Sequence, residues 1–285
     1  DSGGIQFTAL KAAAKTDLVK SADWILPLDV DEFVNIHCGD GTFTALHNAL
    51  PDATAITLTW RLFGNADIVR FDGFFVTDTF TRCAPNVIYW PWRAAMFKTL
   101  YKNDGVYRKP GVHRPRDPDR DRLDEAQWFD GEGRALDEQF KTRRIFSNFG
   151  RPNHALVQLN HYPLGAMESY VLKADRGRAV HSEDRLGLDY WAERNFCSDK
   201  DTSIRRYASA RDTHLAALMA DAELAELHAN AVAWRKDRFE QLMLEEPFRA
   251  LFGRLLMASP TRPVGMEEAR FLARYGTRAR QHAPQ

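Results

Sequence analysis

The chain has 285 residues, 44% of them hydrophobic, with 39 basic and 39 acidic side chains. This length suffices for one large or two small domains with a sizeable core. A formal net charge of zero provides no global field that attracts nucleic acid or anionic lipid, and nucleic acid is not expected as a partner. Three widely separated cysteines indicate neither a disulfide framework nor a zinc site, and they favour a reducing, cytoplasmic compartment.

The hydrophobic pattern predicts a helix, then mostly strands, then helices. Residues 5–20 carry apolar side chains at helical spacing. Residues 114–141 are charged and irregular, which favours a solvated loop or, alternatively, a mobile lid. Strands are expected at residues 24–28, 55–63, 74–80, 87–89 and 155–162, and helical spacing at 167–178 and from 204 onward. No segment approaches the roughly 18 apolar residues of a membrane span, and the first residues lack signal-peptide character, so a soluble protein is expected.

Trp24–Phe33 is an apolar run that ends on closely spaced acids, Asp29 and Asp31. A run that is apolar on both faces is typical of a central strand, which needs a neighbour at each edge. The residues before Trp24 offer one helix and no second strand, so we expect an incomplete sheet or a substituting element. Strand alternation would turn Val30 into the protein and let both carboxylates converge on Mg²⁺ or Mn²⁺. The alternative is a turn with solvated acids.

This segment resembles the Trp-hydrophobic-Asp-x-Asp-Glu-Phe signature of glycosyltransferases with the GT-A fold, related to glycosyltransferase family 2 and the family 92 group. Three further stretches match in the same order: Trp60–Gly64, Asp78–Phe80, and a block that runs from Asn160-His161-Tyr162 to Arg176-Gly177. The resemblance implies an α/β fold in which a GT-A, Rossmann-like mixed sheet is flanked by helices. Residues 1–205 would form this domain without its first strands, and 206–285 a helical C-terminal extension.

The resemblance also implies an activity, the metal-dependent transfer of a sugar from a nucleotide-diphosphate sugar to a glycan or other hydroxyl acceptor, as in polysaccharide biosynthesis. Asp29 and Asp31 would hold Mn²⁺ or Mg²⁺, with Asp31 the first candidate for a direct ligand and Asp29 shared with the ribose or the metal. An imidazole suits Mn²⁺ as a third ligand. His161 is the first candidate, followed by His113 and His181.

Other side chains are candidates for the remaining chemistry. Asp78 is the first candidate for a catalytic base, with Glu168 as its rival. Lys98 and Arg93 are candidates for phosphate contacts, although both could equally be solvated rim residues. Trp60 and Trp92 are expected in the core, with stacking on a sugar as the alternative.

Two other functions remain open at this stage. A haloacid-dehalogenase-type phosphohydrolase also carries Asp-x-Asp close to its amino terminus, although Glu32-Phe33 departs from that pattern and no convincing late acid pair is found. A non-catalytic sugar-binding relative is the second alternative.

Overall fold

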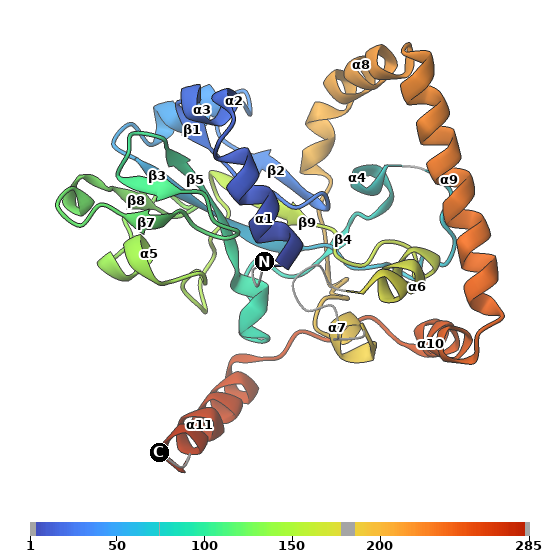
Figure 1. The fold of residues 1–285 in the computed structure, drawn as a ribbon. Helices are drawn as coiled ribbons and strands as arrows, with labels where there is room; N and C mark the ends of the chain where they lie inside the picture. The colour runs from blue at the N-terminus through green and yellow to red at the C-terminus, as the bar shows by residue number, and fades with distance from the viewer. Residues whose placement is uncertain (1–3, 74, 178–185, 283–285) are drawn as a thin grey trace. The chain divides into compact units, whose positions relative to one another are not determined.

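The structure is a computed structural model that describes residues 4–73, 75–177 and 186–282 (Figure 1). It is a mixed α/β protein with a central sheet and a C-terminal helical region. The chain forms two compact units that alternate along the sequence. The first comprises Asp1–Arg61, Ala84–His161 and Arg262–Gln285, and the second comprises Leu62–Cys83 and Tyr162–Thr261.

The first unit is built on a six-stranded mixed sheet of order β1-β5-β3-β9-β2, with β8 beside β3 (Figure 1). The sheet curls into a half-barrel, and β3 with β8 is its one parallel pair. Its strands are β1 (Trp24–Ile25), β2 (Glu32–Ile36), β3 (Ala55–Leu62), β5 (Phe97–Lys102), β8 (Trp128–Phe129) and β9 (Val157–His161).

Helical segments and a hairpin complete the first unit. The helical segments are α1 (Gly4–Ala13), α2 (Asp17–Ser21), α3 (Phe43–Ala49), η1 (Trp92–Ala95), η2 (Leu123–Glu125), α5 (Glu138–Thr142) and α11 (Met266–His282), and the hairpin pairs β6 (Tyr107–Lys109) with β7 (Arg116–Pro118). Thr16 and Thr42 begin α2 and α3, because each side-chain oxygen accepts a hydrogen bond from a backbone amide of the first turn.

Strand β3 is the buried centre of this sheet. Ile56 and Leu58 pack into one apolar cluster, while Ala55 packs into a second cluster with Phe97 and Tyr101. Successive side chains of a strand point to opposite faces, so β3 is covered on both faces, although Thr57 and Thr59 on the face of Ala55 are buried polar residues.

The expectation of a central strand at residues 24–28 is wrong. β1 is two residues long, half-buried, and pairs with β5 at one end of the strand order. Pro27 interrupts the apolar run and has no N–H to donate to a ladder. Among the described residues no strand pairs with the other side of β1, so the described sheet ends there.

The remaining sequence expectations have mixed outcomes. The helix expected at residues 5–20 is present as two helices, α1 and α2. Helices at 167–176 and beyond 204, and strands within 55–63 and 155–162, are confirmed, while residue 178 of the helix expected at 167–178 lies outside the described residues. The strand expected at 74–80 is wrong, since Val76–Thr79 forms α4, and 87–89 is irregular. The irregular segment 114–141 contains β7, β8 and α5.

The second unit is mainly helical. Its elements are α4 (Val76–Thr79), β4 (Arg82–Cys83), α6 (Met167–Arg176), α7 (Leu188–Ala192), β10 (Asp199–Lys200), η3 (Ser203–Tyr207), α8 (Ala208–Met219), α9 (Ala222–Met243) and α10 (Glu246–Met257). Its core brings Tyr170 and Val171 of α6 against Leu242 of α9 and Leu255 of α10. Over the described part of the chain, no helix has the length and apolarity needed to cross a bilayer.

Candidate functional site

The two acids of the Asp-x-Asp sequence lie on a tight turn between β1 and β2. The Glu32 amide donates to the Asp29 carbonyl at 3.1 Å and closes this turn. Val30 stands at its tip with 95% of its surface exposed. The expectation that Val30 points into the protein is wrong, because the alternation of side chains holds only for extended backbone.

Asp29 is held by two side chains from elsewhere in the sequence. Its Oδ1 accepts from Gln6 Nε2 of α1 at 2.8 Å, and its Oδ2 lies 2.9 Å from Lys98 Nζ of β5. Lys98 is only 1% exposed. The interpretation of Lys98 as a solvated rim residue is therefore wrong, and its charge is already directed at the acidic turn.

Glu32 is the member of the site that the sequence reading passed over. Its side chain is fully buried, and Oε1 accepts from the Trp60 indole N–H at 2.7 Å. Oε2 accepts from the Asp29 amide at 2.9 Å and lies 3.5 Å from Lys98 Nζ. Burial raises the pKa of Glu32 to about 7, and Lys98 opposes part of that rise. Its position directly after Asp31 is the feature of the sequence that could have identified Glu32 as a residue of the site.

Asp31 meets His161, as predicted. In the antiparallel ladder of β2 and β9, Glu32 lies opposite His161, which brings the residue before β2 beside the end of β9. His161 Nε2 lies 3.7 Å from Asp31 Oδ1, and the His161 ring lies 4.3 Å from that of Trp60. The structure thus pairs a carboxylate oxygen with an imidazole nitrogen.

This pair fits part of a metal shell. A carboxylate and an imidazole are suitable ligands for Mn²⁺. Across residues 4–73, 75–177 and 186–282, no group of three or more His, Cys, Asp or Glu side chains is arranged to hold a metal. Asp29 faces Lys98, so Asp31 and His161 are the protein ligands that the geometry offers, and substrate oxygens and water would complete the shell.

His113 belongs to the same neighbourhood. Its Nδ1 lies 3.0 Å from the Phe97 carbonyl, and its ring is 5.8 Å from that of Trp60. Burial, with the charge of Lys98 second, lowers the pKa of His113 to about 4. A backbone carbonyl can only accept, so the neutral ring carries its proton on Nδ1 and its lone pair on Nε2. His181, the third histidine candidate, lies outside the described residues.

The other predicted site residues have different surroundings. Arg93 is exposed on η1, with its guanidinium 5.2 Å from the centroid of the Trp92 ring. Asp78 and Glu168 belong to the second unit. Asp78 lies on α4, not at a strand end, and pairs with Arg211 at 2.8 Å.

Glu168 lies in the first turn of α6 and has a structural contact. Its Oε2 accepts from the Phe71 amide at 2.9 Å. This carboxylate oxygen therefore holds the backbone at Phe71.

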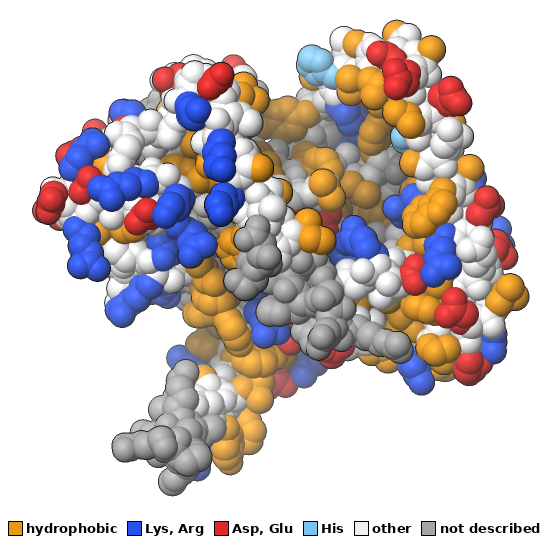
Figure 2. Space-filling model, in the orientation of Figure 1, with side chains coloured by type: hydrophobic (Ala, Val, Ile, Leu, Met, Phe, Trp, Pro, Cys, Tyr) orange, Lys and Arg blue, Asp and Glu red, His pale blue; other side chains and the backbone are white. Residues whose placement is uncertain are grey.

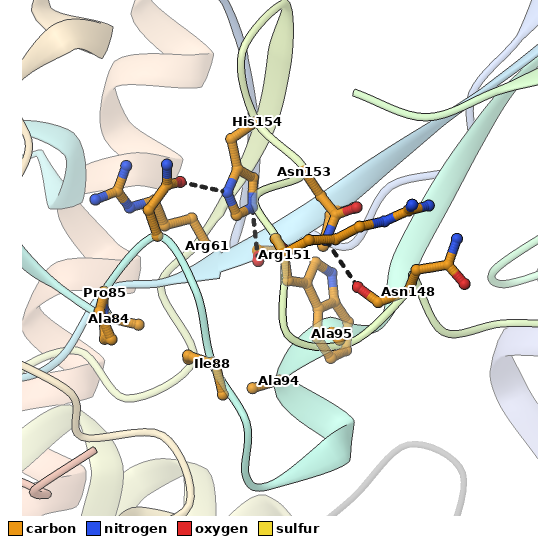
Figure 3. A pocket seen from close by; sticks show the side chains of 13 residues that line it. Arg61, Ala84, Pro85, Ile88, Ala94, Ala95, Asn148, Arg151, Asn153 and His154 are labelled. Atoms are coloured by element: carbon orange, nitrogen blue, oxygen red, sulfur yellow. Dashed lines mark hydrogen bonds between the residues drawn. The ribbon is translucent and has the colours of Figure 1, made fainter. Parts of the chain in front are cut away.

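A pocket with polar and apolar lining residues adjoins Trp60 on the first unit (Figure 3). It encloses about 350 Å³, open solvent included, and is lined by Thr59, Trp60, Arg61, Ala84, Pro85, Asn86, Ile88, Ala94, Ala95, Asn148, Arg151, Asn153 and His154. His154 bridges its wall, with Nδ1 2.9 Å from Asn86 Oδ1 and Nε2 3.3 Å from the Trp60 carbonyl. The lining carries two arginines and no acid, so it differs in charge from the acidic turn.

Comparison with known proteins assigns no family. No protein-family model matches this chain, and a search of curated proteins finds no match.

Proposed function

We propose that this protein is a metal-dependent glycosyltransferase that moves a sugar from a nucleotide-diphosphate donor to a hydroxyl acceptor. The observation that carries the proposal is the meeting of Asp31 and His161, 3.7 Å apart, beside the buried Lys98. The two ligands come from separate motifs of the glycosyltransferase resemblance, and the fold brings them together.

Each residue of the site has a separate part in this proposal. Asp31 and His161 would hold Mn²⁺ or Mg²⁺, and that ion would supply Lewis-acid stabilisation of the charge developing on the diphosphate. Lys98 neutralises Asp29, and the Glu32 carboxylate fixes both the turn and the Trp60 indole. The ligands are therefore oriented before substrate binds, which lowers the reorganisation needed in the reaction.

The pocket beside Trp60 is the proposed acceptor position. Its amide and guanidinium groups offer hydrogen bonds to hydroxyls, while Ile88 and the alanines offer an apolar surface. Binding sites for small polar molecules combine apolar walls with a few placed polar groups. Trp60, near the end of β3, lines the pocket and also contacts His161. The acceptor and the nucleotide-sugar donor would therefore lie on either side of the end of β3.

The proposal is tested by thermal shift and calorimetry with nucleoside diphosphates in the presence and absence of Mn²⁺. A ligand that binds only the native state raises its stability, so a shift that requires both metal and nucleotide is expected. Asp31→Asn should weaken nucleotide binding in Mn²⁺ by more than about tenfold, because it removes a charged ligand. Asp52→Asn, an exposed acid elsewhere on the first unit, is the matched control.

Incubation with substrates separates the alternatives. Transfer or slow hydrolysis of a nucleotide sugar supports the proposal. Phosphate release from a phosphomonoester would support the phosphohydrolase instead, and sugar binding with neither reaction would indicate a non-catalytic relative. Unchanged nucleotide titration of Asp31→Asn in Mn²⁺ would refute the metal assignment.

A further inference from the structure

Helix α11 has an unusual surface for a protein helix. It runs for 17 residues, Met266–His282. Every side chain described in it is exposed except that of Ala269, which is half-buried. Most helices in proteins are stabilised by packing one apolar face rather than by helix propensity alone. The helix therefore has the pattern of an element that docks on something else.

The exposed side chains of α11 are segregated by type. Phe271 and Tyr275 are four residues apart on one stripe, with Leu272 beside them, and their exposed fractions are between 40% and 53%. Figure 2 shows hydrophobic side chains on the described part of this helix. Residues four apart share a helix face, so the aromatic stripe is continuous.

A basic stripe runs next to the aromatic one. Arg270, Arg274 and Arg278 repeat at the same spacing of four. The Arg274 guanidinium carbon lies 5.5 Å from the Phe271 centroid and 5.6 Å from the Tyr275 centroid. The guanidinium groups therefore border the rings.

The acids of the helix do not cancel this stripe. Glu267 and Glu268 both lie in the first turn, and Glu268 pairs with Arg262 at 2.8 Å and accepts from the Gly265 amide. The two acids thus stay at the start of the helix, where acidic side chains are favourable.

We propose that α11 lies in the interface of an anionic lipid surface, with Phe271, Leu272 and Tyr275 inserted and the three arginines on the headgroups. A helix with a segregated apolar face, a basic polar face and low overall hydrophobicity binds the membrane interface without spanning it. The arginine stripe selects an anionic surface over a neutral one. The chain as a whole has no net charge, so this attraction is local to the helix. The inference does not depend on the proposed enzymatic activity.

The test uses the full chain in flotation with lipid vesicles. Binding is expected to vesicles that contain phosphatidylglycerol and to be weak on pure phosphatidylcholine. Joint Arg270→Gln, Arg274→Gln and Arg278→Gln should reduce partition by about a hundredfold, since each basic residue at an anionic surface contributes about fivefold. A control with Lys15→Gln, Arg120→Gln and Arg143→Gln removes the same charge from exposed positions elsewhere and should retain binding.

A second variant tests the apolar stripe. Phe271→Ser with Leu272→Ser should also abolish binding, with circular dichroism and thermal unfolding unchanged because both side chains are exposed. Equal binding to both vesicle types, or no loss in either α11 variant, overturns the proposal. Self-association in solution that the serine variant abolishes, without vesicle binding, would identify a second copy of the chain as the partner and would also overturn it.

Discussion

Two ion pairs of nearly equal length occupy different environments in this protein. Lys98, with 1% of its side chain exposed, lies 2.9 Å from Asp29, whose side chain is 40% exposed, whereas the side chains of Arg211 and Asp78, 2.8 Å apart, are 26% and 35% exposed. Distance alone would rank them as equals. A buried charge that loses its partner is strongly destabilising, while exposed pairs contribute little. Burial therefore distinguishes the site of the first unit from the surface pair of the second.

The largest effect is expected from Lys98→Met. This change leaves the buried Glu32 and the adjacent Asp29 without their cation, so the free energy of unfolding at neutral pH should fall by about 3 kcal/mol. Urea denaturation measures it. Lys102→Met, an exposed position on the same strand, is the control and should change stability by less than about 0.5 kcal/mol. Equal effects of the two variants would remove the contrast between buried and exposed charge.

The pH dependence of stability sharpens the same comparison. The folded protein raises the pKa of Glu32 from 4.5 to about 7, so between those values the native state holds a proton that the unfolded chain has released. The proton retained by Glu32 therefore stabilises the native state fully below about pH 4.5, and this contribution to the free energy of unfolding is lost as pH rises through about 7. In metal-free buffer this amounts to about 3 kcal/mol. Glu32→Gln should flatten the profile over this interval, and an unaltered slope would contradict the assignment.

The smallest effect is expected from Asp78→Asn in the second unit. Because its pair with Arg211 is partly exposed, stability should fall by less than about 1 kcal/mol. The same variant tests the role that the resemblance implied for Asp78. A loss of turnover of about a hundredfold or more, with KM unchanged, would make Asp78 the base in spite of its partner.

The sequence predicted some contacts of this site and missed others, for identifiable reasons. His161 could be predicted beside Asp31 for two reasons. Residues 155–162 read as a strand that ends on a histidine, and Asn160-His161-Tyr162 follows the Asp-x-Asp segment in the same order as in the glycosyltransferase resemblance. The Glu32 and Lys98 pair could not, because buried charges are rare and only the tertiary fold supplies their partners. The edge position of β1 was missed because the apolar composition of residues 24–28 predicted a central strand, whereas Pro27 has no N–H to donate and interrupts that strand.

Segment 74–80 shows the limit of local propensity. Val76 and Thr77 favour a strand, yet residues 76–79 form α4. Arg205 donates to the Asp78 carbonyl at 2.7 Å, and Arg211 pairs with the Asp78 carboxylate. These partners lie more than a hundred residues later, so no local pattern could reveal them.

Trp60 contacts both the acidic turn and the pocket of the first unit. Its indole N–H donates to Glu32 under the acidic turn, and its carbonyl faces His154 at the pocket wall. If a ligand on one side displaced this residue, the hydrogen bond on the other side would change. Affinity at the two places would then be interdependent, and thermodynamic linkage would require the dependence to be equal in both directions. A molecule held in the pocket would then change the affinity for metal by the same factor by which metal changes the affinity for that molecule.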